Sequence, residues 1–118
     1  MYKSFRDMEI WQLALEVAEK TFNLTEHLPK KEDYGLTSQI RRSALSISAN
    51  IAEAFGRHHI NDKIKFYYYS RGSITETQSH LEYGKRVGYF EKEIVENLDQ
   101  DLSSLTLSLN KLIKSLKS

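Results

Sequence analysis

The fold is decided by residues 98–116, which read LDQDLSSLTLSLNKLIKSL. Six of the seven leucines of this stretch follow alternating steps of four and three: Leu98, Leu102, Leu105, Leu109, Leu112 and Leu116. This spacing is a heptad seam, sustained for nearly three heptads, along which a helix packs against a partner. Acidic residues gather in the first half and lysines in the last turns, as the helix macrodipole favours. We therefore expect an amphipathic helix over about residues 91–116.

Three further helical segments precede this one. Their expected bounds are residues 7–28, residues 31 or 33 to 55, and residues 61–87. Pro29 ends the first segment because proline disfavours helical geometry in the residue before it. Gly56 is expected to end the second in a left-handed conformation, and Gly88 to end the third. Asn61 is the expected N-cap of the third.

Four amphipathic helices joined by short loops predict an all-α fold, an antiparallel up-down-up-down four-helix bundle. A length of 118 residues suits one domain, so residues 1–118 are expected to form a single unit. Small residues share a face of the third segment with larger ones, which lets a neighbouring backbone approach closely. The face consists of Phe66, Ser70, Ser73, Thr77, Leu81 and Gly84.

The first segment has an apolar face that covers about half of its circumference, more than a small monomeric bundle needs. Its central stripe consists of Trp11, Leu15, Ala18 and Phe22, widened by Ile10, Ala14, Val17 and Leu24. The excess apolar surface calls for a partner. We therefore expect an obligate homo-oligomer.

Composition narrows the class of protein. The chain has 17 Lys and Arg against 16 Asp and Glu, a net charge of +1, which excludes a histone-like cationic tail. Cysteine is absent, which excludes disulfides, thiolate nucleophiles and Cys-ligated metal sites. No apolar stretch is long enough for a signal peptide or a membrane span. We expect a cytoplasmic protein with no membrane partner.

Catalytic motifs are not apparent. His58 and Asp62 are spaced as a pair of metal ligands on a helix, but a site needs three or four ligands, and a solvated loop is the simpler interpretation. Glu76 and His80, one turn apart, suggest a hydrogen-bonded pair. The chain has no nucleophile elbow and no glycine-rich phosphate loop. We expect no enzyme activity, no catalytic residue, no metal and no cofactor.

The run Phe66-Tyr67-Tyr68-Tyr69 is unusual because side chains 100° apart on a helix cannot share one surface. At most two of the four can enter the core. The others are expected to be exposed, packed on a partner subunit, or available to stack on bases. Packing is the simpler interpretation.

A polar stripe runs along the second segment through Arg42, Ser46, Asn50, Glu53 and Arg57. It is either a solvated face or a hydrogen-bond network at a helix contact, because mid-helix Ser and Asn are poor choices for an exposed position. We assign a structural role, in a buried or interfacial network, to Arg42, Ser46, Asn50, Glu53, Ser73 and Glu76.

Residues 30–57 and residues 58–88 each carry five basic and three acidic side chains, so the middle of the chain is its basic half. Arg57, Lys63 and Lys65 are expected to surround one corner of the bundle. The candidate nucleic-acid contacts are Arg41, Arg42, Arg57, Lys63 and Lys65, with Arg42 shared between structure and binding.

The order of motifs along the chain closely resembles the four-helix-bundle proteins encoded within intervening sequences of bacterial 23S ribosomal RNA genes. The motifs are FRDMEIWQ at 5–12, QIRRSA at 39–44, SISANIAEA at 46–54, Gly56-Arg57, RGSITE at 71–76 and LEYGKRVG at 81–88. The resemblance maps an Arg-Arg pair to Arg41 and Arg42, an Asn-x-x-Glu to Asn50 and Glu53, and a Gly-Ser-x-x-Glu to Gly72, Ser73 and Glu76.

The resemblance implies a bundle that assembles into a ring, typically a homopentamer. The family includes accessory proteins of diversity-generating retroelements, which are thought to bind nucleic acid and a reverse transcriptase. Two functions therefore stay open. The first is binding of structured RNA or an RNA–DNA intermediate through phosphate contacts. The second is a protein-interaction scaffold, an accessory ring with a protein partner and no nucleic-acid role.

Overall fold

The computed structural model describes residues 2–118 and contains four α-helices. They are α1 (Glu9–Leu24), α2 (Leu36–Gly56), α3 (Ile60–Arg86) and α4 (Lys92–Lys117), with short 3-10 turns η1 (Phe5–Asp7) and η2 (Lys30–Glu32). The described residues include no strand, so the expected all-α class with four helices is confirmed.

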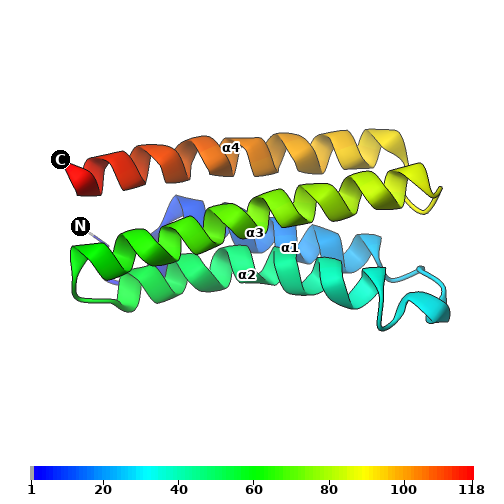
Figure 1. The fold of residues 1–118 in the computed structure, drawn as a ribbon, viewed down its shortest axis with the longest axis horizontal. Coiled ribbons are helices and arrows are strands. Elements are labelled where there is room, and N and C mark those ends of the chain that lie inside the picture. Colours follow the sequence, from blue (N-terminus) through cyan, green and yellow to red (C-terminus); the bar gives the residue numbers. More distant parts are fainter. Residues whose placement is uncertain (1) are drawn as a thin grey trace.

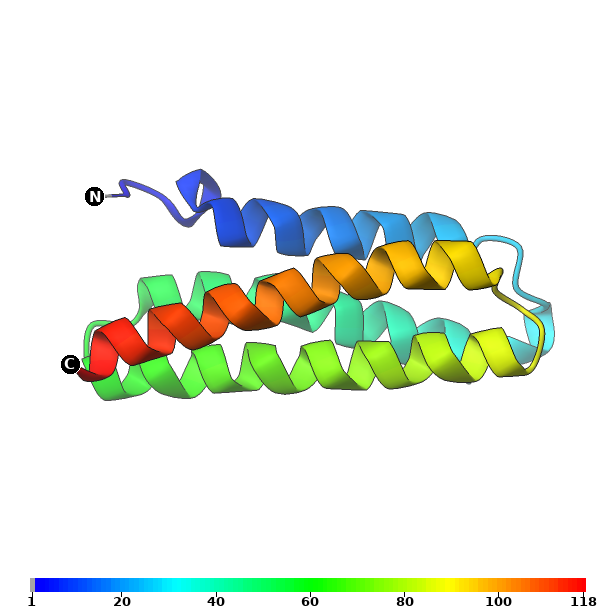
Figure 2. The same ribbon diagram turned by 90° about the horizontal axis from the view of Figure 1, so that it is seen from above.

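Each helix packs against the next one in the chain, and α4 closes the bundle against α1 (Figures 1 and 2). Successive connections lie at alternating ends of a body of 45 × 23 × 21 Å. Both chain termini and the α2–α3 turn lie at one end, and the α1–α2 and α3–α4 connections lie at the other. Among residues 2–118, no helix is long and apolar enough to cross a membrane.

The leucine seam of α4 faces the core as predicted over its first four positions. Leu98, Leu102, Leu105 and Leu109 are buried, whereas Leu112 is only partly buried and Ile113 takes the next core position. An α-helix has 3.6 residues per turn, so a strict heptad drifts around a straight helix. The change from Leu112 to Ile113 follows that drift.

The α2–α3 pair makes the most extensive helix contact, and small hydroxyl residues line it. The Ser70 hydroxyl donates to the carbonyl of Ile47 at 2.8 Å, and the Ser43 and Thr77 hydroxyls lie 2.8 Å apart. All three side chains are buried. Small side chains bring the two backbones together, and their hydroxyls are satisfied by hydrogen bonds inside the contact.

The helix ends differ in part from the sequence prediction. Gly88 ends α3 as expected: its φ is +89°, and the amides of Gly88 and Tyr89 donate to the carbonyls of Lys85 and Gly84 in a Schellman motif. The left-handed stop at Gly56 is wrong, because Gly88 is the one glycine with positive φ in the described chain. Instead, extended backbone at Arg57 turns the chain directly after α2.

Other boundaries are also corrected. His59, not Asn61, is the N-cap of α3, and Asn61 lies inside its first turn. The first helix ends at Leu24 rather than at residue 28, and Thr25 donates its hydroxyl to the Thr21 carbonyl at that end. The second helix begins at Leu36, after the separate turn η2.

Glu32 connects the two loops at the end of the bundle far from the termini. Its Oε1 accepts from the Leu36 amide at 3.2 Å, and its Oε2 accepts from the Tyr89 hydroxyl at 2.9 Å. The Leu36 hydrogen bond, with that of Tyr89 second, lowers the pKa of the Glu32 carboxyl below its usual 4.5. The carboxylate thus fixes the start of α2 and holds the α3–α4 loop beside it.

Tyr89→Phe should raise the pKa of Glu32 toward its ordinary value, because one of the two donors to the carboxylate is lost. A carboxyl with a lowered folded-state pKa stabilises the fold above its unfolded-state pKa, and this stabilisation is lost as the pH falls through the folded value. The variant should therefore show less pH dependence of stability below about pH 5. An NMR titration of the Glu32 carboxyl, with denaturation at several pH values, measures both effects. An unchanged Glu32 titration would contradict the contact.

Candidate nucleic-acid interface

The α2–α3 turn brings Arg57, Lys63 and Lys65 to one end of the bundle, as predicted from their spacing. Lys65 is exposed, with its Nζ 5.9 Å from the centroid of the Tyr69 ring. Arg57 is exposed, donates from Nε to Glu53 Oε2 at 3.1 Å, and lies over the Phe66 ring. A guanidinium has further N–H donors, so this ion pair leaves Arg57 able to contact a phosphate.

Lys63 also has a structural contact that the sequence did not indicate. Its Nζ donates to the carbonyls of Ala54 and Phe55, both at 3.2 Å. These carbonyls belong to the last turn of α2, where helix carbonyls lack partners within the helix and attract a cation. Lys63 therefore caps α2 in addition to contributing charge.

Arg41 and Arg42 lie far from this corner. Sixteen residues of helix separate Arg41 from Arg57, a distance of about 24 Å along α2. Arg41 donates from Nε to the Thr25 hydroxyl at 2.7 Å and from Nη2 to the Phe22 carbonyl at 3.4 Å. Its guanidinium also lies 4.3 Å from the Phe22 ring centroid, so Arg41 binds the C-terminal end of α1. The five candidate cations do not form one surface within the chain.

The polar stripe separates into local contacts. Arg42 pairs with Glu76 across α2 and α3, and Glu76 also lies 3.3 Å from His80 Nε2, as expected for that pair. Asn50 donates its amide to the Ser46 carbonyl within α2 at 2.8 Å. Glu53 pairs with Arg57, and Ser46 and Ser73 are half-buried. The Arg42–Glu76 pair joins two helices; an interfacial role for the other members stays a prediction.

The fold also gathers basic side chains that sequence reasoning did not place at this corner. We call residues 2–7, 57–65 and 111–118 the basic end. It carries two acids, Asp7 and Asp62, and eight basic side chains: Lys3, Arg6, Arg57, Lys63, Lys65, Lys111, Lys114 and Lys117. The opposite end, residues 26–35 and 82–96, carries five basic and seven acidic side chains. The bundle is therefore electrostatically polarised along its length.

The aromatic run of α3 lies next to the basic end. Tyr67 is buried in the core, Phe66 and Tyr68 are partly buried and pack against it, and Tyr69 is 49% exposed, so one of the four is a core residue, within the predicted limit of two. Lys117 Nζ donates to the Tyr68 hydroxyl oxygen at 2.7 Å, which holds the end of α4 against α3. This hydrogen bond is the main cause that lowers the pKa of Tyr68.

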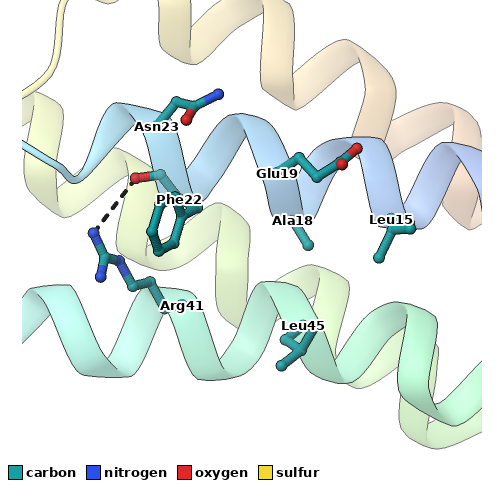
Figure 3. Close-up of a pocket in the computed structure, with 7 residues that line it drawn as sticks. All are labelled: Leu15, Ala18, Glu19, Phe22, Asn23, Arg41 and Leu45. Atoms are coloured by element: carbon teal, nitrogen blue, oxygen red, sulfur yellow. Dashed lines mark hydrogen bonds between the residues drawn. The ribbon is translucent and has the colours of Figure 1, made fainter.

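A second surface feature is an apolar groove of about 450 Å³ between α1 and α2 (Figure 3). Its lining is Leu15, Ala18, Glu19, Phe22, Asn23, Arg41 and Leu45. Phe22 is 48% exposed and Leu45 is 56% exposed. The residues of α1 that are buried are Ala14, Val17 and Thr21, so the predicted central stripe of this helix lies largely in the groove rather than in the core.

The described residues show no group of three or more His, Asp or Glu side chains placed to hold a metal ion. His58 and His59 are both exposed in the α2–α3 loop, with their rings in edge contact. The exposure of this pair agrees with the interpretation of a solvated loop.

Comparison with known proteins identifies the family. The family model of the 23S rRNA-intervening sequence protein matches residues 6–111. Six chains among solved structures also match. One is a protein of unknown function from the S23 ribosomal protein family of Bacteroides thetaiotaomicron, with 26% identity and a TM-score of 0.80 over 89% of this chain and 98% of that chain. The curated proteins gave no match. Sequence motifs, fold and family model agree, and the chain belongs to the 23S rRNA-intervening sequence protein family.

Proposed function

We propose that this protein is a non-enzymatic homo-oligomer that binds nucleic acid through its basic end. The observation that carries the proposal is the gathering of eight Lys and Arg side chains at one end of a chain whose net charge is only +1, against Asp7, Asp62 and the Glu53 carboxylate that pairs with Arg57. Phosphate backbones bind such surfaces through charge neutralisation and counterion release. The proposed ligand class is structured RNA or an RNA–DNA intermediate.

The proposed assembly is an antiparallel up-down-up-down bundle repeated around a ring, a homopentamer by family resemblance. A single protomer offers few phosphate contacts. Cyclic symmetry would repeat the basic end once per protomer and place the copies at the same height of the ring. Repetition raises the number of phosphates on one ligand molecule that the assembly neutralises, and with it the affinity.

A fluorescence-anisotropy titration of generic RNA and DNA at several salt concentrations tests the proposal. Binding should be detectable at low salt and should weaken steeply as salt increases, with little dependence on base sequence, because a bundle end presents no helix shaped to enter a groove. Absence of binding at low salt would contradict the proposal and favour the alternative described next.

The alternative is a protein-interaction scaffold, an accessory ring that docks a partner protein such as a reverse transcriptase. The apolar groove between α1 and α2 favours this function, because exposed apolar surface marks sites of protein contact. A pull-down from the native cell, with RNA sequencing and mass spectrometry on the same sample, separates the two functions.

If the groove is the contact between protomers, Leu45→Glu should dissociate the oligomer, whereas an unchanged mass would leave the groove open for a partner protein. Leu45 lines the groove, and a charged carboxylate buried in an apolar contact without a partner carries a large desolvation cost. Light scattering at micromolar concentration should give a multiple of the 13.8 kDa protomer for the parent and a smaller mass for the variant. Leu107→Glu on α4, also at an exposed leucine, is the matched control and should keep the parent's mass. A parent mass near 13.8 kDa would contradict the assembly itself.

A further inference from the structure

Accessible aromatic rings at the start of α3 have cations beside them. Arg57 Cζ lies 4.7 Å from the Phe66 ring centroid, and Lys65 Nζ lies 5.9 Å from that of Tyr69. Both distances are within reach of cation–π attraction. A surface in which rings and cations alternate can bind a single strand, because the rings stack on bases while the cations contact the phosphates between them.

The Tyr68 ring, which lies between Phe66 and Tyr69 in the chain, also has cations beside it. Arg71 Cζ lies 4.7 Å and Lys117 Nζ 5.3 Å from the Tyr68 ring centroid, on the side of the bundle where α4 ends. Arg71 also donates to Asn110 Oδ1 at 2.8 Å, and Lys117 to the Tyr68 hydroxyl. These contacts hold Tyr68 between α3 and α4 and leave Tyr69 as the freer ring.

Tyr69 is positioned to accept a base. Its ring meets the Phe66 ring edge to face, with centroids 5.5 Å apart and planes at 89°, while half of the side chain remains exposed. An edge-to-face contact orients a ring without covering both of its faces. Tyr69 is therefore supported by its neighbour and still accessible to a ligand.

Gly72 leaves the adjacent surface bare. It is exposed one turn after Tyr68 and Tyr69, and a Cβ added there would meet nothing within 4 Å. A helical side chain covers the turn on the N-terminal side of its own Cα, which here is the turn that carries the two tyrosines. A glycine at this position keeps that turn uncovered, so a planar base has room to approach Tyr69.

We infer that the ligand of the basic end is single-stranded nucleic acid, with a base stacked on Tyr69 and its flanking phosphates contacted by Lys65 and Arg57. This inference rests on the proposed function and narrows its ligand class from structured nucleic acid in general to unpaired segments. In a duplex the faces of the bases are covered by their stacked neighbours, so a duplex could use the phosphate contacts alone.

The test compares a labelled single-stranded oligonucleotide of about 12 nucleotides, within the usual footprint of stacking proteins, with its blunt duplex at one low salt concentration. The parent should bind the single strand more tightly. Tyr69→Leu should weaken single-strand binding by about tenfold, the usual size of one lost stacking contact, and leave duplex binding unchanged. Tyr69→Phe should bind like the parent and quench a 2-aminopurine base in the strand equally well.

Tyr83→Leu is the matched control, because Tyr83 is an equally exposed tyrosine near the other end of α3. It should not change binding. Equal affinity of the parent for duplex and single strand, or unchanged binding by Tyr69→Leu, would overturn the inference and leave the proposed function standing. If Tyr69→Leu dissociates the oligomer, the Tyr69 side chain belongs to a contact between subunits, and this result would also overturn the inference. Failure of the parent to bind either oligonucleotide at low salt would overturn the proposed function as well.

Discussion

Replacing Gly84 with alanine should destabilise the bundle by about 2 kcal/mol, because the new methyl group overpacks a closed contact. A Cβ added at Gly84 would lie 2.2 Å from Cε2 and 2.3 Å from Cδ2 of the Phe90 ring. Phe90 is only 4% exposed, so its ring cannot move aside into solvent. The Gly84 carbonyl also accepts from the amides of Tyr89 and Phe90, which fixes the loop that carries the ring. Urea denaturation followed by circular dichroism measures the loss.

Gly72→Ala is the matched control for this prediction. It is the same substitution on the same helix, at an exposed position with open space around the added Cβ. Alanine is a better helix former than glycine, so this variant should gain roughly 0.5–1 kcal/mol. Equal stability changes in the two variants would show that the Phe90 ring yields to the methyl group and that Gly84 is not required by packing.

The sequence predicts the helices and the close approach of a neighbouring backbone to one face of α3, because both depend on short periods along the chain. The leucine seam of α4 and the small residues of α3 repeat every three or four positions, and a helix places such residues on one face wherever it packs. The contact of Phe90 with Gly84 could not be predicted, because it depends on the path of a loop. Gly84 appears in the sequence only as one more small residue.

The core face of α1 shows a different limit. Projection of the sequence gives an apolar arc of half the circumference and a central stripe of large residues, including Leu15 and Phe22. The structure instead buries Ala14, Val17 and Thr21, because small side chains let α1 approach its neighbours. Thr21 satisfies its hydroxyl by donating to the Val17 carbonyl at 2.7 Å, so it can be buried without an unpaired polar atom. A size-blind projection of hydrophobicity cannot distinguish the core edge of such an arc from its exposed edge.

The candidate site also has one part that the sequence predicts and one part that it does not. The grouping of Arg57, Lys63 and Lys65 follows from their positions around one turn, and the sequence predicts it. Arg41 and Lys63 each cap the end of the preceding helix, so both contacts require the chain to reverse and bring that end within reach. The contribution of the chain termini to the basic end likewise depends on the order in which the helices pack. Charge counts along the sequence contain these lysines but give no position for them in space.

Reversal of two charges at the basic end, Lys65→Glu/Lys114→Glu, should weaken nucleic-acid binding on the order of a hundredfold at low salt. Two phosphate contacts per protomer are lost, and each contributes about half a power of ten between 50 and 200 mM salt, so two protomers on one ligand account for about a hundredfold. The slope of log affinity against log salt should also become shallower by about 1.5 per protomer that contacts the ligand. Anisotropy titrations at several salt concentrations give both quantities.

Lys65 and Lys114 are the appropriate positions because both are exposed and, within residues 2–118, neither side chain donates to a backbone carbonyl. Lys114 lies in the last turn of α4, so its reversal also weakens the interaction with that helix dipole, by roughly 0.3–1 kcal/mol at an exposed position. A glutamate at position 63 would instead place a negative charge against the carbonyls of Ala54 and Phe55, and would destabilise the end of α2. Loss of binding in that variant would mix a folding defect with the loss of a contact. Far-UV circular dichroism and light scattering should show that the Lys65/Lys114 variant keeps the fold and mass of the parent.

Lys30→Glu/Lys92→Glu makes the same change in net charge at the opposite end of the bundle, where both lysines are exposed. If the basic end is the binding surface, this variant should retain most of the parent's affinity and its salt slope at about 0.1 M salt, because charges farther from the ligand than the Debye length of about 10 Å at that concentration are screened. Equal losses in the two variants would show that binding follows total charge and not this surface. Affinity that does not change with salt would contradict phosphate contacts anywhere on the protein, since neutralisation of each phosphate must release counterions.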